Sequence, residues 1–379
     1  MSQQAQIDDT DLVQLLTPTG QRVDHPDYTP RIAHLDAAAL RGMYRDMVMT
    51  RRFDSEATAL QRQGELGLWA QSLGQEGAQV GSGRAAAPRD MIFPAYREHG
   101  VAFTRGLELT KILRQFRGID HGGWDPKDHN FHLYTLVVGS HTLHATGYAM
   151  GLQRDGVVGT GDPDRDTATM VYFGDGATSQ GDTSEALVFA AVNNAPVVFF
   201  CQNNQWAISE PTSRQSRVPL YYRGSGFGIA SLRVDGNDVL ACYAVTSEAL
   251  ERARSGGGPT FIEAYTYRMG AHTTSDDPTR YRSAAEEQYW RDRDPIERLR
   301  VLLVAEGAAD DAWFAELDAE AAAYGEHIRS TVRAFERPAT MSMFSDVYAG
   351  PHAIVDDERA WFEAYQRTFA DTPATTGVH

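Results

Sequence analysis

The tripeptide Gly174-Asp175-Gly176 and the dipeptide Asn203-Asn204 constrain the fold of this chain more than any other feature. An apolar run precedes each of them, and a helix-like stretch lies between the two runs. The resulting pattern of strand, helix and strand covers residues 170–173, 182–194 and 197–201. A right-handed crossover of this kind brings the carboxyl ends of both strands to one edge of a parallel sheet. We therefore expect Asp175 and Asn204 to lie close together.

A carboxylate and an amide oxygen at one sheet edge suit magnesium, which proteins hold through one or two oxygens together with a substrate phosphate. Each motif alone has an ordinary explanation, because Gly-Asp-Gly is a common turn and Asn-Asn a common loop. Their combination across one strand–helix–strand unit favours a metal–diphosphate site. A dinucleotide fingerprint is not matched, because its third glycine is missing after Gly176, and no glycine run is followed by a P-loop lysine.

Composition narrows the possible partners. The chain has 379 residues, 42% of them apolar, which is sufficient for one large α/β domain or for two domains. Its formal net charge of −16 argues against nucleic acid or an anionic membrane as a partner, because the chain would repel phosphate. Cys201 and Cys242 have neither disulfide nor metal spacing and are expected in the core. The start is polar and no apolar run approaches ~20 residues, which predicts a cytoplasmic protein.

Alternating strands and helices predict an α/β fold with a largely parallel sheet flanked by helices. Residues 1–35 are polar and proline-containing, and we expect an extended N-terminal arm there. Residues 36–300 are predicted to form the α/β domain, and residues 301–379 a helical C-terminal region packed on it. Within that region, apolar residues recur every three or four positions from Trp313 to Phe335, as in an amphipathic helix.

Tyr96 and Arg97 follow a proline turn and are candidates for anion binding. The planar guanidinium group of arginine can donate two parallel hydrogen bonds to a phosphate. By itself, Arg97 is better explained by a surface ion pair. A diphosphate site nearby favours the interpretation of Arg97 as a phosphate ligand.

A second polar segment, residues 267–277, follows an apolar strand and contains Arg268 and His272. Ligand-binding groups of α/β enzymes lie at such strand ends. A lone histidine is more often structural. The glycine, hydroxyl and acidic neighbours of His272 nevertheless predict a side chain that titrates near neutrality and transfers protons. Weaker candidates of the same kind are His99, His141 and His144.

Taken in order, these motifs resemble the α subunit of the E1 component of 2-oxo-acid dehydrogenases, a family that depends on thiamin diphosphate. The resemblance runs from about residue 52 to residue 348. It rests on residues 96–98, on 174–176 with 203–204, and on 267–277 with 281–282. Residues 234–239 and 344–348 are closer to the branched-chain type than to the pyruvate type. The fold that it implies is the thiamin-diphosphate-binding fold.

The resemblance also implies contacts at matching positions. Magnesium would be bound by Asp175, Asn204 and the main-chain oxygen of Trp206. The diphosphate would be contacted by Tyr96, by Arg97 and by the main-chain N–H groups of Gly176 and Ala177. The remaining predicted cofactor contacts are Gly174, Val138, Ser140, Arg268 and His272.

The same resemblance implies an α2β2 tetramer. The β chain would hold the aminopyrimidine of the cofactor and supply the glutamate that activates it. A branched-chain 2-oxo acid would lose carbon dioxide, and its acyl group would pass to a lipoyl arm of the E2 core. His272 matches the family histidine that helps orient the intermediate and assists this transfer.

Several positions depart from the family pattern. Gln202 stands where the branched-chain pattern has an arginine, so one cationic phosphate contact is in doubt. Residues 138–144 lack the proline and glutamine that relatives usually have. Thr273 and Ser283 match positions that are phosphorylated in mitochondrial relatives, but the sequence indicates neither a kinase nor a potassium site.

Three alternatives remain open at this point. The substrate could be pyruvate or acetoin with the same chemistry. The metal–diphosphate site expected at Asp175 and Asn204, called the clamp below, could instead belong to a magnesium-dependent protein that binds nucleotides or phosphosugars. The chain could also be a non-catalytic assembly subunit.

Overall fold

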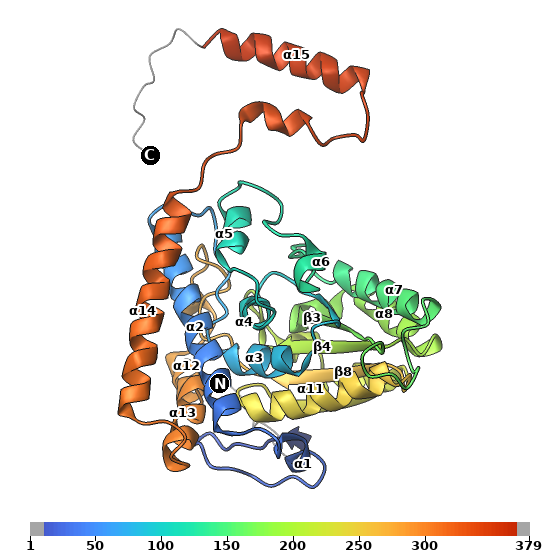
Figure 1. Cartoon of the computed structure of the whole chain (residues 1–379), viewed down its shortest axis with the longest axis vertical. Coiled ribbons are helices and arrows are strands. Elements are labelled where there is room, and N and C mark those ends of the chain that lie inside the picture. The colour runs from blue at the N-terminus through green and yellow to red at the C-terminus, as the bar shows by residue number, and fades with distance from the viewer. Residues whose placement is uncertain (1–10, 370–379) are drawn as a thin grey trace. The chain divides into compact units, whose positions relative to one another are not determined.

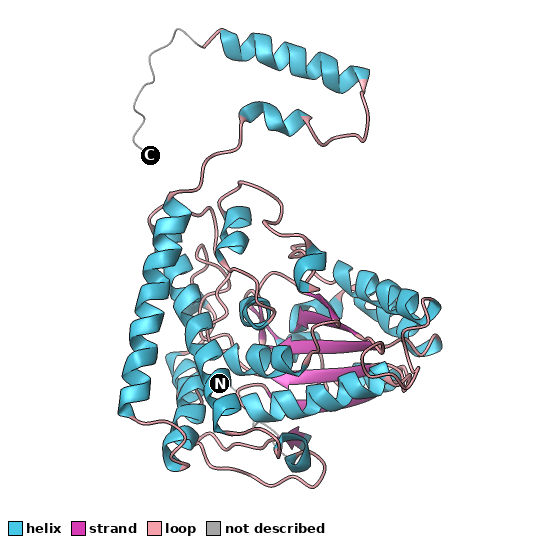
Figure 2. Cartoon of the chain, in the orientation of Figure 1, coloured by secondary structure: helices cyan, strands magenta, loops and turns pink. Residues whose placement is uncertain are grey.

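The computed structural model describes residues 11–369, and its internal contacts divide the chain into two units, Met1–Ala334 and Phe335–His379. The larger unit is built on a six-stranded sheet with the strand order β1-β7-β8-β4-β3-β2. Figure 1 labels the neighbouring strands β3, β4 and β8, and Figure 2 shows the strands in magenta. All five pairings in it are parallel. Its strands are β1 (Leu12–Val13), β2 (Met91–Phe93), β3 (Thr169–Gly174), β4 (Val197–Asn203), β7 (Ala230–Asp235) and β8 (Thr260–Tyr265). The predicted α/β fold with a parallel sheet is confirmed.

Helices cover both faces of the sheet, which explains why its central strands are continuous apolar runs. Successive residues of β3 point to opposite faces. Phe173 belongs to a core cluster with α7 (Ser140–Arg154) and α8 (Gly181–Val192). On the other face, the hydroxyl of Tyr172 lies 2.9 Å from that of Ser82 in α3 (Glu76–Ala85). Helix α3 packs in turn against α11 (Val239–Arg254).

Two long helices pack against each other beside this core. Helix α2 (Ala37–Arg62) begins at Asp36, whose side chain accepts a hydrogen bond from the Ala39 N–H at 2.8 Å. Helix α14 (Asp311–Arg333) buries one apolar stripe against α2. This is the amphipathic helix that the sequence predicts from Trp313, and it ends at Arg333.

The other elements of the larger unit are short. Its remaining helices are α1 (Thr29–Ile32), α4 (His99–Thr104), α5 (Thr110–Phe116), α6 (Pro126–His129), α9 (Thr212–Gln215), α10 (Tyr222–Gly226), α12 (Ala284–Arg291), α13 (Pro295–Ala305), η2 (Asp175–Ser179) and η3 (Pro278–Arg280). A two-stranded hairpin joins β5 (Trp206–Ala207) to β6 (Glu210–Pro211). The smaller unit contains η4 (Thr340–Phe344) and α15 (Ala353–Arg367).

The domain boundary expected at residue 300 falls inside α13. The unit that contains the sheet continues through α14 to Ala334. The packing of residues 335–379 on the α/β domain stays a prediction.

The N-terminal segment adds an edge strand to the sheet. Strand β1 pairs with β7, and Asp238 Oδ2 accepts hydrogen bonds from the main-chain N–H groups of Leu15 and Leu16 at 2.7 and 2.5 Å. The other oxygen of Asp238 accepts from Leu240 and Ala241 at 3.0 Å and caps α11. One carboxylate therefore both caps α11 and anchors residues 15 and 16 of the arm expected over residues 1–35, of which residues 1–10 lie outside the described part of the chain.

Replacing Asp238 with alanine should lower the free energy of unfolding by about 2–4 kcal/mol, because buried main-chain N–H groups lose their acceptor. Four of these groups donate to Asp238. Asp238→Asn keeps one acceptor oxygen and should lose less. Urea unfolding followed by circular dichroism measures both values. Equal unfolding midpoints for Asp238→Ala and the wild type would contradict this role.

Candidate active site

A cleft of about 280 Å³ lies at the carboxyl ends of β3 and β4. It contains most of the residues that the sequence singles out. The lining includes Tyr96, Arg97, Val138, Gly174, Asp175, Gly176, Ala177, Asn204, Trp206, Arg268 and His272. Ser140 is not part of the lining; it begins α7, and its hydroxyl donates to the main-chain oxygen of Val137 at 3.0 Å.

Parallel pairing brings the two halves of the predicted clamp to the same edge. Gly174 of β3 is in register with Gln202 of β4, and Asp175 and Asn204 follow just beyond. Both side chains line the cleft. Their convergence was the central expectation from the sequence, and it follows from the crossover through α8.

The Asp175 carboxylate is held by α9, whose residues the sequence analysis missed. Its Oδ2 accepts hydrogen bonds from Gln215 Nε2 at 2.8 Å and from Thr212 Oγ1 at 3.4 Å. Burial raises the pKa of Asp175 to about 6, while the hydrogen bond from Gln215 opposes this shift. Since a buried carboxylate is costly without a compensating charge, this position favours a bound cation.

Asn204 has an oxygen available for such a cation. Its Nδ2 donates to Gln75 Oε1 at 2.8 Å, which turns the amide oxygen the other way. That oxygen accepts only a long contact, 3.3 Å from the main-chain N–H of Trp206. Within residues 11–369 no group of three or more His, Cys, Asp or Glu side chains could hold a metal ion. One carboxylate and one amide nevertheless fit magnesium, whose other ligands are phosphate and water.

Gln75 is a further residue of the cleft that the sequence analysis missed. It lines the cleft, and its Nε2 is a buried donor without a hydrogen-bond partner within the described part of the chain. Buried donors are normally satisfied, so an unpaired one in a cleft suits an acceptor on a ligand. The signal in the sequence was a polar residue just before α3, between Gly74 and Gly77.

The main-chain oxygen of Trp206, the third predicted metal ligand, accepts a hydrogen bond from Arg268 Nη1 at 2.8 Å. A carbonyl oxygen has two lone pairs, and one of them remains for a metal. Arg268 Nη2 also donates to the main-chain oxygen of Ile208 at 2.8 Å. Arg268 thus holds the loop that carries Trp206.

Two guanidinium groups face His272. Its Nδ1 lies 3.3 Å from Arg97 Nη2 and 3.3 Å from Arg268 Nη1. Because arginine only donates, Nδ1 must accept, and the neutral ring carries its proton on Nε2. Burial, followed by the charges of Arg97 and Arg268, lowers the pKa of His272 to about 3. The expectation that His272 titrates near neutrality is therefore wrong; at pH 7 it is a neutral hydrogen-bond donor.

The loop that carries His272 is fixed by its own side chains. Asp276 Oδ2 accepts from the His272 N–H at 2.8 Å and from the Tyr281 hydroxyl at 2.5 Å. Arg268 donates to the same hydroxyl at 2.9 Å. Arg97 completes the arrangement by donating to the main-chain oxygen of His272 at 2.9 Å.

Glycine is required where the hairpin approaches η2. A Cβ atom on Gly176 would lie 2.9 Å from the Cβ of Ala207, closer than such atoms normally come. Tyr96 lies edge-on to His272, with ring centroids 6.4 Å apart.

The three weaker histidine candidates occupy other environments. His99 is buried, with its Nδ1 2.8 Å from the Tyr134 hydroxyl and its Nε2 2.9 Å from the Ala70 oxygen. His141 lines the cleft and donates through Nε2 to the Tyr172 oxygen at 2.6 Å. His144 is exposed on α7.

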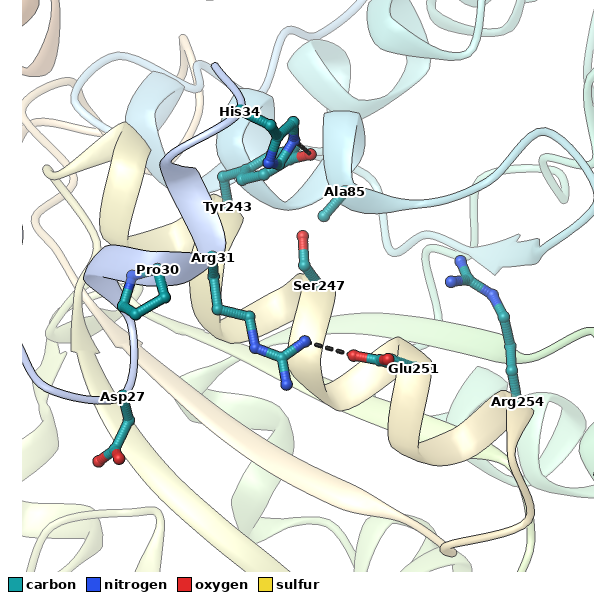
Figure 3. A pocket seen from close by; sticks show the side chains of 9 residues that line it. All are labelled: Asp27, Pro30, Arg31, His34, Ala85, Tyr243, Ser247, Glu251 and Arg254. Carbon is teal, nitrogen blue, oxygen red and sulfur yellow. Dashed lines mark hydrogen bonds and ion pairs between the residues drawn. The ribbon is translucent and has the colours of Figure 1, made fainter. Parts of the chain in front are cut away.

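A larger cavity of about 620 Å³ lies between the N-terminal arm and α11 (Figure 3). Arg31 and Glu251 pair across it, and Arg254 at its end pairs with Asp90. His34 Nε2 lies 3.0 Å from the Tyr243 hydroxyl. None of the predicted site residues lines this cavity.

Between residues 11 and 369, no helix is both long and apolar enough to cross a membrane.

Comparison with known proteins agrees with the geometry of the cleft. A family profile described as "Dehydrogenase E1 component" matches residues 44–338. The 3-methyl-2-oxobutanoate dehydrogenase subunit alpha of Mycobacterium tuberculosis (strain ATCC 25618 / H37Rv) is 46% identical over 88% of this chain and 87% of that protein. The mitochondrial 2-oxoisovalerate dehydrogenase subunit alpha 2 of Arabidopsis thaliana is 39% identical over 82% of this chain and 66% of that protein. The pyruvate dehydrogenase E1 component subunit alpha of Acholeplasma laidlawii is 40% identical over 72% of this chain and 77% of that protein.

The match covers most of the chain, and the resemblance found in the sequence is confirmed. The chain belongs to the dehydrogenase E1 component family.

Proposed function

We propose that this chain is the α subunit of the E1 component of a branched-chain 2-oxo-acid dehydrogenase complex. The reaction is the oxidative decarboxylation of a branched-chain 2-oxo acid with transfer of the acyl group to lipoyl groups of E2. The supporting observation is the similarity to the alpha subunit of 3-methyl-2-oxobutanoate dehydrogenase, 46% over 88% of the chain. The pyruvate-specific relative is 40% identical over 72% of the chain, so pyruvate is the second candidate substrate.

Family membership implies thiamin diphosphate as the cofactor, and the residues of the cleft fit it. Asp175, Asn204 and the main-chain oxygen of Trp206 would hold Mg2+. The unpaired Nε2 of Gln75 and the guanidinium of Arg97 would face diphosphate oxygens. Further contacts are proposed for Tyr96, Val138, Gly174, Gly176, Ala177 and Arg268, whereas Ser140 lies outside the lining of the cleft.

When bound, the cofactor supplies the electron sink for decarboxylation, and the protein supplies position and charge. His272 presents a neutral Nε2–H as a donor to an oxygen of the substrate. Arg97 and Arg268 keep the proton on that nitrogen by occupying Nδ1. The apolar side chains of Val138 and Ile208 line the mouth of the cleft and would limit access of water.

The proposal includes a β subunit and a cytoplasmic α2β2 tetramer. Family membership implies a β partner and a lipoylated E2 core. We assign the glutamate that activates the cofactor to the β chain. The purified α chain is therefore expected to be inactive, and activity should appear when a co-expressed β chain is added. Full decarboxylase activity of α alone would contradict this division of the site.

The affinity for Mg2+ with thiamin diphosphate should fall about tenfold per pH unit below pH 6. Burial raises the pKa of Asp175 from 3.8 to about 6, so below that pH the carboxyl keeps a proton that the cation must displace. Without metal, the stability contributed by neutral Asp175 is lost as the pH rises through about 6. Calorimetry of the tetramer between pH 5 and 8 measures the affinity. Asp175→Asn should bind weakly with a shallower pH dependence, and an equally steep dependence in that variant would contradict the assignment.

Substrate choice is tested by the decarboxylation rates of the tetramer with 3-methyl-2-oxobutanoate and with pyruvate. A higher kcat/KM for the branched-chain acid is expected. Equal or better turnover of pyruvate would reject the branched-chain assignment. Calorimetry with thiamin diphosphate and, separately, with ADP distinguishes the proposed function from nucleotide binding. We expect the tetramer to bind thiamin diphosphate tightly and ADP weakly.

A further inference from the structure

Gln202 lies at the end of β4, beside Gly174 of β3, in the wall of the cleft. Its side chain is buried. Its neutral amide lies close to the proposed diphosphate site and contributes no charge to it. The hydrogen bonds of this amide indicate that it has a different role.

Gln202 belongs to a closed ring of buried hydrogen bonds around the backbone of Arg97. Its Nε2 donates to Glu98 Oε1 at 2.7 Å, and its Oε1 accepts from Gln79 Nε2 at 3.1 Å. Gln79 Nε2 also donates to the main-chain oxygen of Arg97 at 2.9 Å. The main-chain N–H of Arg97 donates to Glu98 Oε2 at 3.2 Å, which closes the ring. Both polar groups of the Arg97 backbone are thereby fixed.

Only a side chain that both donates and accepts can occupy position 202 in this ring. Glu98 presents an acceptor to it and Gln79 presents a donor. Gln79 cannot be reversed, because its Oε1 accepts from the Gly100 N–H at 2.8 Å. An arginine has donors alone and would face the Gln79 donor. With no cation at position 202, burial raises the pKa of Glu98 to about 7, while the hydrogen bond from the Arg97 N–H opposes the shift.

The side chain of Arg97 connects the ring to His272. The guanidinium of Arg97 extends from the fixed backbone to the main-chain oxygen of His272 at 2.9 Å and to its Nδ1 at 3.3 Å. Arg97 Nη1 also donates to the main-chain oxygen of Gln71. A shift of the Arg97 backbone would move this guanidinium away from all three acceptors.

We propose that Gln202 is a positioning residue, which acts through Glu98 and Gln79 to fix the backbone of Arg97. It thereby directs the Arg97 guanidinium to the diphosphate and keeps the proton of His272 on Nε2. This role rests on the proposed function, because the diphosphate belongs to that proposal.

The test uses the complete tetramer with four α chains: wild type, Gln202→Met, Glu98→Gln and the exchange Glu98→Gln with Gln202→Glu. Methionine keeps the volume and removes both hydrogen bonds. Glutamine at position 98 sets its own N–H group against a donor, either Gln202 Nε2 or the Arg97 N–H, in both orientations of its amide. The exchange swaps the amide and the carboxyl, and it restores every donor–acceptor pair in the ring.

Calorimetry with thiamin diphosphate and Mg2+ at pH 7.5 is the first readout. Gln202→Met and Glu98→Gln should each weaken binding by about 10- to 100-fold, since buried groups lose their partners. The exchange should restore affinity to within about threefold of the wild type, a recovery that lost packing alone would not show. Weak binding by the exchange variant in a correctly assembled tetramer would overturn the ring as the cause.

If Gln202→Met does not assemble, the comparison of Glu98→Gln with the exchange variant decides the question.

The two proposals fail in different ways. A wild-type tetramer that binds no thiamin diphosphate contradicts the proposed function. A wild-type tetramer that binds it, while Gln202→Met binds equally well, contradicts only the positioning role of Gln202.

Discussion

Replacing Asp175 with alanine is expected to lower decarboxylation by at least about a hundredfold in a tetramer that still assembles. Among residues 11–369, two carboxylates line the cleft: Asp175, at the strand edge where the diphosphate is proposed to bind, and the buried Glu98. Without Asp175, the Mg2+ ion would lose the proposed carboxylate ligand and would bind weakly. The diphosphate would then lack the positive charge of the ion that neutralises it. The apo chain should be little affected, because a buried carboxylate with a raised pKa contributes no large stabilisation at pH 7.

The measurement is single-turnover decarboxylation by the α2β2 tetramer, together with calorimetry of thiamin diphosphate. Asp182→Ala is a matched control, because Asp182 is exposed in the first turn of α8, a short distance along the chain. It should leave both values unchanged. An Asp175→Ala tetramer with full activity would favour a non-catalytic role for this chain.

Replacing His272 with alanine should reduce acyl transfer to the lipoyl group by about a hundredfold, and decarboxylation itself much less. The neutral ring offers one Nε2–H to the substrate side, while two arginines hold the opposite nitrogen. Loss of that donor removes a directed hydrogen bond from the cleft and leaves the metal ligands in place. The second half of the reaction should therefore be more sensitive than the first.

The two half-reactions are separated by comparing a lipoyl domain with an artificial oxidant as acceptor. His272→Asn keeps an amide donor and should retain more transfer than His272→Ala. Because the pKa of His272 is about 3, the wild-type rate should show no inflection from this group between pH 5.5 and 8. An inflection in that range that disappears in His272→Asn would contradict a neutral histidine.

The convergence of Asp175 and Asn204 could be predicted from the sequence because it depends on topology. Two apolar strands joined by a helix must place their ends on one edge, and the motifs lie at those ends. The family resemblance supplied the predicted contacts in the loops, such as Trp206 and His272, and both residues line the cleft. Both inferences use only the order of the strands and motifs along the chain.

The contacts that the sequence did not indicate depend on distant segments. Gln215 and Thr212 reach Asp175 from α9, and Gln75 reaches Asn204 from the start of α3. None of them belongs to a motif with a characteristic spacing. Glutamine and threonine in loops are also too common to single out without coordinates.

The error about His272 has a related cause. Its polar neighbours in sequence indicated a solvated ring, but its charged neighbours in space are Arg97 and Arg268. Burial and two positive charges lower the pKa of the ring, an effect that local sequence does not contain. In the fold, the short strands β1 and β2 lacked any periodic signal, because two or three residues are too few to show alternation.

The most direct test of the central claim is the position of the metal. Crystals of the α2β2 tetramer with thiamin diphosphate and Mn2+ in place of Mg2+ would locate the ion by anomalous diffraction. We predict one peak per α chain, within coordination distance of Asp175 and the amide oxygen of Asn204 and in contact with the diphosphate. A fully occupied cofactor with no metal peak between these two side chains would contradict the proposed clamp.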